Sequence, residues 1–185
     1  DVLLDLSEYI SEDAPYYPRA LEAFQYQGIQ GALPETFSTV LLFYNKDLFD
    51  QAGVDYPTAE WTWEDAVAAG EAITALGDDT WGLISPIQFW EFYKKAGQNN
   101  CQFFNEDMTE STINEPECVE ALEMMVSFME NDVMPDEVEL GGLANEDLFA
   151  QGKLGMIVVG IWLFDMFQEA PFDWDITLEP GMASK

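Results

Sequence analysis

Trp162 stands where an aromatic ring can meet a ligand. It follows an apolar run at residues 154–159 that has the length and composition of a buried strand, with Gly160 close behind that run. Open α/β sheets bind ligands beyond the carboxyl ends of interior strands, so a large ring at such an end can line a binding site. The alternative interpretation is a tryptophan that packs in the core beneath the following helix.

A second group of candidate side chains, Gln88, Phe89 and Trp90, lies between a predicted strand and a predicted helix. If this segment is helical, neighbouring side chains point in different directions, so the three cannot all face one ligand. The alternative to a binding role is that Phe89 or Phe92 packs inward.

The sequence offers little support for catalysis. It contains no histidine, which excludes, within these residues, a serine–histidine–aspartate triad and an HExxH zinc site. Asp and Glu number 36 among 185 residues, so some carboxylates will reach the spacing of about 5 to 9 Å that glycosidases use by chance alone. The acids therefore do not indicate an enzyme, and no cofactor is predicted.

Metal and disulfide chemistry rest on few residues. Cys101 and Cys118 have no CxxC spacing and no histidine nearby, so zinc binding is not expected. In an oxidising compartment they can form a disulfide, and two buried free thiols are an equal alternative. The acidic segment 105–117 lacks the glycine that a calcium-binding EF-hand loop requires at its sixth position. No metal site is predicted.

The charge of the chain excludes two classes of partner. Only six Lys and Arg oppose the 36 acids, which gives a net charge of -30. A nucleic-acid-binding face needs clustered cations, and an anionic membrane surface repels such a chain. With 48% apolar residues, however, the chain is not a disordered acidic tail.

The same charge indicates a salt-rich environment. Repulsion among acids destabilises a compact state at low salt, whereas at molar salt the Debye length is about 3 Å and the repulsion is largely screened. The alternative, an acidic protein that binds cations or basic partners, predicts clusters of acids. Here the acids are scattered along the chain, so a halophilic source is the better prediction.

The elements that would position these residues alternate as in α/β domains. We expect strands at 36–44, 81–85, 154–159 and 172–180, and helices at 45–53, 62–76, 87–97, from 114 to beyond 129, at 145–152 and after Trp162. Thr62 and Asp65 predict a capping box, and Asn114 is the predicted cap of a later helix. The apolar faces expected for these two helices are Ala66, Val67, Ile73 and Leu76, and Val119, Leu122, Val126 and Met129. No apolar run reaches about 18 residues, so no transmembrane helix is expected.

The order of motifs resembles a known family. The pieces that carry the likeness are LLDLSEYI at 3–10, LPETFSTVLLFYNKDLFDQAGVDYP at 33–57, TWEDAVAAGEAI at 62–73, WGLI at 81–84, TINEPECVEALEMMVSFMEND at 112–132, LFAQGKLGMIVVGIW at 148–162 and FDWDITLEPG at 172–181. In this order they resemble the extracellular solute-binding proteins of sugar ABC importers, the group that includes maltose-binding protein. No single motif is specific, but the ordered set is.

The resemblance implies a fold and a division of the chain. It implies an α/β lobe of the type II periplasmic-binding-protein class, with three layers and a central mixed sheet, from a two-lobed protein that closes at a hinge. Residues 1–35 would be the tail of an incomplete first lobe, 36–176 the second lobe, and 177–185 a strand that returns to the first lobe. The chain begins at Asp1, without Met or a signal peptide, so we expect a processed or excised form.

The resemblance also implies site residues. The Gly-x-Trp after residues 154–159 would place Trp162 in the cleft as a platform for a sugar ring, with Gly160 permitting close approach of the backbone. One of the aromatics Phe89 and Trp90, with Gln88, would contribute from the segment at 88–90.

Further ligand contacts would come from the first hinge strand, at Phe37 and Ser38. A family member has a sugar-contacting carboxylate near the position of Ser38, and serine would replace it with a weaker hydrogen bond, unless Glu35 substitutes for it. The alternative is that Ser38 is a solvated strand residue.

The function that follows is a non-catalytic receptor that captures a carbohydrate between two lobes and presents it to the membrane permease of an ABC transporter. We expect a monomer, extracellular or at the cell surface, with the lipid anchor usual in the family. Two alternatives stay open. A glycan-processing enzyme would turn over a glycoside with a pair of carboxylates, and an acidic interaction module would bind no small molecule and lose its partner as salt is added.

Overall fold

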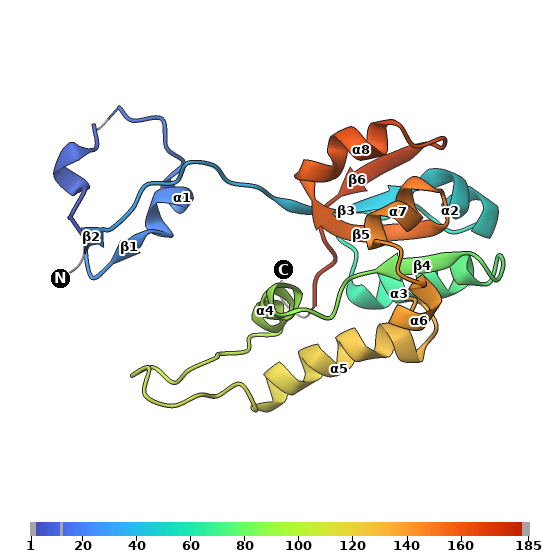
Figure 1. Cartoon of the computed structure of the whole chain (residues 1–185). Helices are drawn as coiled ribbons and strands as arrows, with labels where there is room; N and C mark the ends of the chain where they lie inside the picture. Colours follow the sequence, from blue (N-terminus) through green and yellow to red (C-terminus); the bar gives the residue numbers. More distant parts are fainter. Residues whose placement is uncertain (1–2, 12, 183–185) are drawn as a thin grey trace. The chain divides into compact units, whose positions relative to one another are not determined.

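The computed structural model describes residues 3–11 and 13–182 and divides the chain into two units, Asp1–Thr39 and Val40–Lys185 (Figure 1). The sequence analysis placed a boundary after residue 35, whereas the compact units meet between Thr39 and Val40. That these units belong to two lobes of a larger protein stays a prediction.

The first unit is small and has little interior. It contains a 3-10 turn η1 (Ser7–Tyr9), a short helix α1 (Pro18–Glu22) and a hairpin of β1 (Gln25–Tyr26) and β2 (Ile29–Gln30). Among its described residues only Gln30 is buried, and its side-chain amide donates to the Leu21 carbonyl at 3.1 Å. The described part of this unit therefore lacks an apolar core of its own.

The second unit is built on a four-stranded mixed sheet with the strand order β4-β5-β3-β6. The strands are β3 (Val40–Asn45), β4 (Trp81–Ile84), β5 (Leu154–Gly160) and β6 (Trp174–Thr177). Strands β4 and β5 are parallel, and β3 is antiparallel to both β5 and β6. The predicted central mixed sheet is confirmed. Strand β3 begins at Val40 rather than at 36 because Val40 pairs with Gly160, the last residue of β5.

Helices surround this sheet (Figure 1). They are α2 (Lys46–Ala52), α3 (Trp63–Thr74), α4 (Phe89–Gln98), α5 (Pro116–Glu130), α6 (Glu137–Leu140), α7 (Asn145–Ala150) and α8 (Phe164–Gln168), with a 3-10 turn η2 (Ile161–Leu163) before α8. Helices α2, α3, α7 and α8 pack against the sheet, and α4 packs against α5. Helix α3 lies against β4, where a Cβ added to Gly82 would lie 2.3 Å from the Gly70 backbone. Gly82 is therefore needed for this close approach, whereas a Cβ added to Gly70 would lie 2.5 Å from the Val133 side chain.

The predicted helix signals were mostly right. The Thr62–Asp65 capping box begins α3, and Gly53, at φ 67°, ends α2 in the left-handed conformation. In α3, Ala66 and Ile73 are buried, but the expectation that Leu76 faces inward is wrong because α3 ends at Thr74 and Leu76 is exposed.

Helix α5 differs from the prediction by one residue. Its N-cap is Glu115 rather than Asn114, and Glu115 makes no side-chain capping bond. The buried face consists of Cys118, Ala121, Met125 and Phe128, whereas the predicted Val119 and Leu122 are exposed. The face is set by tertiary contacts, since Cys118 is bonded to Cys101 and the Phe128 ring lies 5.5 Å from that of Trp63.

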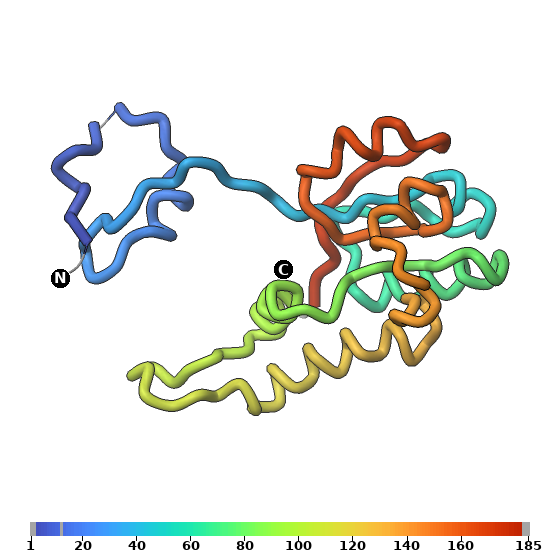
Figure 2. The backbone as a smooth tube through the Cα atoms, in the orientation of Figure 1, coloured from blue at the N-terminus to red at the C-terminus, as the bar shows by residue number. Residues whose placement is uncertain are grey.

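A disulfide closes the excursion between α4 and α5. It joins Cys101 to Cys118, whose Cα atoms are 4.9 Å apart, and these residues form a small core with Ala96 and Ala121. Figure 2 shows the chain leaving α4, extending away and returning to α5. Of the two alternatives for these cysteines, the structure therefore has the disulfide.

The main core lies around β3. The Phe43 ring contacts Phe164, Phe167 and Trp174 at centroid distances of 5.4, 5.3 and 5.7 Å. After β6 the chain continues along the second unit, where Gly181 pairs with Thr62. Residues 183–185 lie outside the described residues, so a return of this segment to another lobe stays a prediction. Among the helices that the structure describes, none is long and apolar enough to span a membrane.

Candidate functional site

Trp162 lies immediately beyond β5, within η2, and 64% of its surface is exposed. Its ring covers Gly160, since a Cβ added there would lie 1.8 Å from a carbon of the ring. The interpretation of Trp162 as a core residue is therefore wrong. Gly160 serves the ring itself, because only a residue without a side chain leaves room for it.

A cavity of about 260 Å³ opens at this end of the sheet. Its wall includes Trp162 and Gly160 from the end of β5 and Val40 from the start of β3. The segment after β4 contributes Gln88 and Trp90. The cavity therefore lies in the second unit, beyond the carboxyl ends of the parallel strands β4 and β5, where open α/β sheets bind ligands.

The side chains of residues 88–90 point in different directions, as expected at the start of a helix. Gln88 is the N-cap of α4, and it lines the cavity together with Trp90, which is 63% exposed. Phe89 does not line it, and its ring lies 6.5 Å from Tyr93 and 6.4 Å from Phe103. The structure thus brings Gln88, Trp90 and Trp162 together and leaves Phe89 in a separate aromatic group.

Phe37, Ser38 and Glu35 belong to the first unit, and all three are exposed. The Phe37 ring lies 5.1 Å from that of Tyr17 in an edge-to-face arrangement. Any contribution of these residues to the same ligand stays a prediction.

The sequence analysis missed three polar residues that line the cavity: Glu91, Asn145 and Glu146. Asn145 and Glu146 begin α7, and the sequence analysis took this segment only as a short helix. Within the described part of the chain, the side-chain amides of Gln88 and Asn145 make no hydrogen bond, so both can bind a ligand. The sequence did contain a signal for these two residues, because the polar segment NED at 145–147 comes shortly before the strand that ends beside Trp162.

The cavity combines aromatic rings with polar side chains, but its described residues do not form a group that could bind a metal ion. Nowhere in residues 3–11 and 13–182 do three or more His, Cys, Asp or Glu side chains converge in a way that could hold a metal ion. Of its two carboxylates, Glu91 is almost fully buried and is paired with Lys95 at 2.8 Å and Lys94 at 2.9 Å. Such an arrangement can hold a flat, hydroxylated ligand by stacking and hydrogen bonding.

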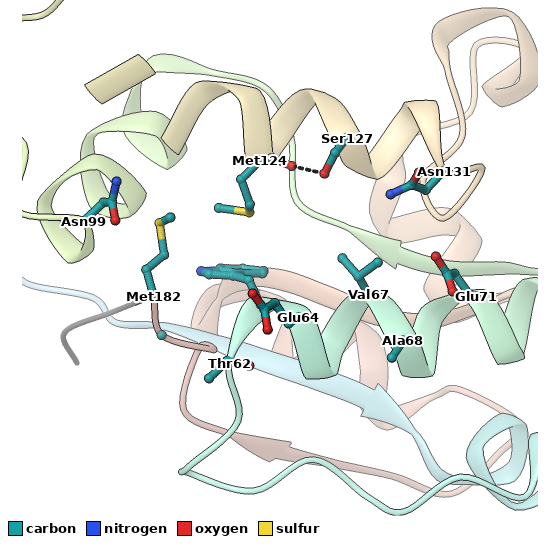
Figure 3. Close-up of a pocket in the computed structure, with 12 residues that line it drawn as sticks. Thr62, Glu64, Val67, Ala68, Glu71, Asn99, Met124, Ser127, Asn131 and Met182 are labelled. Carbon is teal, nitrogen blue, oxygen red and sulfur yellow. Dashed lines mark hydrogen bonds between the residues drawn. The ribbon is translucent and has the colours of Figure 1, made fainter. Parts of the chain in front are cut away.

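A larger cavity of about 720 Å³ lies between α3 and α5 (Figure 3). Val67 and Met124 form part of its apolar wall, and the Ser127 hydroxyl donates to the Met124 carbonyl at 2.7 Å. Its aromatic residue, Trp63, is only 2% exposed, so the ring offers no face on which a ligand can stack. The smaller cavity with two exposed tryptophans is therefore the candidate site.

Comparison with known proteins assigns the chain to a family. The family model described as bacterial extracellular solute-binding protein matches residues 1–182. An ABC substrate-binding protein from Listeria monocytogenes, solved in complex with cycloalternan, is 47% identical, with a TM-score of 0.88 over 99% of this chain. The cyclic α-maltosyl-1,6-maltose-binding protein from Arthrobacter globiformis is 25% identical, with a TM-score of 0.77 over 98% of this chain.

Curated relatives agree with the structures. The maltotriose-binding protein of Pyrococcus abyssi is 25% identical over 183 residues, and the arabinooligosaccharide-binding protein of Halalkalibacterium halodurans is 24% identical over 147. These matches cover 97% and 77% of this chain but only 38% and 32% of the two relatives. The chain thus spans about a third of the length of such curated relatives and about half of the two solved structures.

Proposed function

The chain belongs to the family of bacterial extracellular solute-binding proteins, and we propose that it forms part of the carbohydrate-binding component of an ABC importer. The observation that carries this proposal is the pair of exposed tryptophans, Trp90 and Trp162, on one cavity with the side-chain amides of Gln88 and Asn145. Apolar faces of a sugar ring stack on such rings, and its hydroxyl groups bind the amides.

The ligand class rests on the same geometry. Both tryptophans are more than half exposed, so water covers their rings. Binding becomes more favourable when the apolar face of a sugar ring displaces this water and covers a tryptophan ring. The surrounding acids disfavour phosphorylated or otherwise anionic ligands, since the chain carries a net charge of -30. A neutral saccharide fits these two conditions, and the solved relatives named for cycloalternan and cyclic maltosyl-maltose support this class.

The cavity of the second unit would be one wall of a cleft between two lobes. Closure around a bound sugar requires that the sugar bind the closed form more tightly than the open form. Phe37, Ser38 and Glu35 of the first unit would be further contacts near the hinge, and residues beyond 177 would return to the other lobe. The closed form would be what the permease subunits recognise, and the receptor would act as a monomer.

The proposed role is binding without chemistry. Glu91 is held in ion pairs with Lys94 and Lys95, and Glu146 is the other carboxylate at the cavity. Membership of a family of extracellular binding proteins supports this role and a place outside the cell membrane. A lipid anchor and a halophilic source complete the proposal.

The experiment is a ligand screen on the full-length protein in about molar KCl, where surface repulsion is screened. Thermal stability is measured with mono-, di- and oligosaccharides, polyols and glycerol phosphate, and each mixture is analysed for hydrolysis. A stabilising saccharide that is recovered intact supports a receptor. Cleavage of the saccharide would show an enzyme, and stabilisation by none of these solutes would contradict the proposal.

A further inference from the structure

A group of four charged side chains adjoins the cavity: Glu91 and Lys95 are buried, and Lys94 and Glu179 are partly exposed. Lys95 is fully buried, and its Nζ lies 2.8 Å from Glu91 Oε2 and 3.3 Å from Glu179 Oε1. Lys94 completes the group, with its Nζ 2.9 Å from Glu91 Oε1 and 2.7 Å from Glu179 Oε2. We refer to Glu91, Lys94, Lys95 and Glu179 as the charge quartet.

The quartet uses scarce residues. Two of the six Lys and Arg of the chain belong to it, and Lys95 is the one buried cation among the residues that the structure describes. Buried ion pairs often add little stability relative to apolar residues of the same size, because the charges must be taken out of water. A role in fixing local geometry therefore explains the quartet better than a role in stability.

The geometry that the quartet fixes is that of α4. This helix begins at Phe89 without a side-chain cap, since Gln88 makes no capping bond. Its buried Ala96 belongs to the small core around the disulfide, not to the main core. Charged and polar side chains link α4 to the main core. One such contact places Lys95 Nζ 4.2 Å from the ring centroid of Trp63, which belongs to that core.

The first turn of α4 carries both Trp90, which lines the cavity, and Glu91, which the quartet holds. The Glu91 carboxylate also accepts a bond from the Ser85 hydroxyl at 3.4 Å, at the end of β4. Glu179 brings in the segment after β6, which is further fixed where the Gln98 amide donates to the Pro180 carbonyl at 3.1 Å. The quartet thus ties the start of α4 to two other segments of the second unit.

We propose that the charge quartet is the positioning device of the binding site, and that Lys95 acts on ligand affinity through Trp90. This inference rests on the proposed function for its ligand, and on the contacts above for its mechanism. Removing the Lys95 charge leaves Lys94 as the one cation of the quartet that is paired with both Glu91 and Glu179, so repulsion between these two carboxylates is less well compensated. The first turn of α4 then shifts to relieve this repulsion, and Trp90 shifts with it.

The test is sugar binding by the full-length Lys95→Met and Glu179→Gln variants, of which the second is the milder change. The control is Lys153→Met. This change also removes one lysine charge, but from an exposed ion pair in which Lys153 Nζ lies 3.6 Å from Asp79 Oδ2. We expect the affinity for sugar to fall about tenfold or more in the quartet variants and to stay unchanged in the control. Losses of this size are common at metal sites when a residue that orients a ligand-contacting side chain is removed. The loss should persist in molar KCl, because the Lys95–Glu91 pair is buried and therefore little screened by salt.

A Trp90→Ala background separates positioning from general loss of structure. If Lys95 acts through Trp90, Lys95→Met should have little further effect on affinity once Trp90 is absent. Unchanged affinity in both quartet variants, or an equal loss with and without Trp90, would overturn the proposal.

A measurement without ligand keeps the two proposals distinguishable. If no sugar binds even the unchanged protein, the proposed function fails, but the position of Trp90 can still be observed by fluorine NMR of fluorotryptophan-labelled protein. The Trp90 resonance should move in Lys95→Met and stay in place in Lys153→Met. A Trp90 resonance that is the same in all three proteins would overturn the positioning role.

Discussion

Gly160 and Trp162 form the smallest unit of the site. The glycine leaves the space that the indole ring occupies at the end of β5, while most of the Trp162 surface stays open to solvent. A platform of this kind is fixed by its own neighbour in the sequence rather than by the surrounding core.

The corresponding prediction concerns Gly160→Ala. The added methyl group would lie 1.8 Å from the Trp162 ring, and the exposed ring can swing away, so we expect a folded protein with affinity for sugar reduced by about tenfold or more. The control is Gly97→Ala, where an added Cβ has nothing within 4 Å. Calorimetric titration of both variants checks this, and equal affinity of Gly160→Ala and the unchanged protein would contradict it.

At the residue scale, sequence reasoning identified the tryptophans but not all of their partners. The local pattern of a glycine and a ring after an apolar run left Trp162 as either a core or a cleft residue, and the family resemblance favoured the cleft. Asn145 and Glu146 reach the cavity only because α7 and β5 fold against each other. The quartet is equally non-local, since Glu179 meets Lys95 across 84 positions of the chain.

At the scale of elements, local signals predicted helix ends better than helix faces. The capping box of Thr62 and Asp65 depends on neighbours within one turn, and it was predicted correctly. The buried face of α5 was off by one residue because apolar residues occur on both sides of this helix, and the disulfide and the Trp63 ring select between them.

The Cys101–Cys118 disulfide provides a prediction about α4 and α5. It closes a loop with a sequence separation of 17, for which the chain-entropy model gives about 3 kcal/mol of stability. Replacing both cysteines by serine should therefore lower the free energy of unfolding by about that amount, measured by denaturant titration. Reduction of the unchanged protein should have the same effect, and equal stability with and without reductant would contradict the disulfide.

Tyr56, in the loop after α2, predicts a pH effect. Its hydroxyl donates to Asp50 at 2.7 Å, and this bond, with some burial and nearby acids, raises the pKa of Tyr56 to about 12. A pKa above the unfolded value of about 10 means that the contribution to stability is complete below pH 10 and is lost as the pH rises toward 12.

Ultraviolet titration of the tyrosines tests this assignment. Tyr56 should ionise near pH 12, whereas burial and Asp175 also raise the pKa of Tyr44, so the titration is compared with that of Tyr44→Phe. Asp50→Asn should return the pKa of Tyr56 toward 10 because the charged acceptor is gone. Tyr56→Phe should remove the late transition. Its persistence in Tyr56→Phe would assign the raised pKa to another residue.

At the scale of the whole molecule, charge dominates. With a net charge of -30 and scattered acids, the second unit should be stabilised by salt, and we expect the melting temperature to rise steadily between about 0.1 and 2 M KCl. Replacing exposed acids such as Glu123 and Glu130 by glutamine should weaken this dependence. A melting temperature that does not depend on KCl would contradict the account of the composition.

The mixed sheet and the order of its elements were predictable because each strand and helix carries its own pattern of apolar residues and turns. The division of the chain into parts of two lobes stays a prediction, and the described residues of the first unit include no buried apolar side chain.

The central claim is that Trp162 forms a platform for a sugar, and calorimetric titration of the full-length protein and Trp162→Ala tests it most directly. The control is Phe104→Ala, an exposed aromatic residue that does not line the cavity. We expect saturable binding of a neutral saccharide by the unchanged protein and the control, and a loss of about 2 kcal/mol, or roughly thirtyfold, in Trp162→Ala. Binding of equal strength in Trp162→Ala would contradict it.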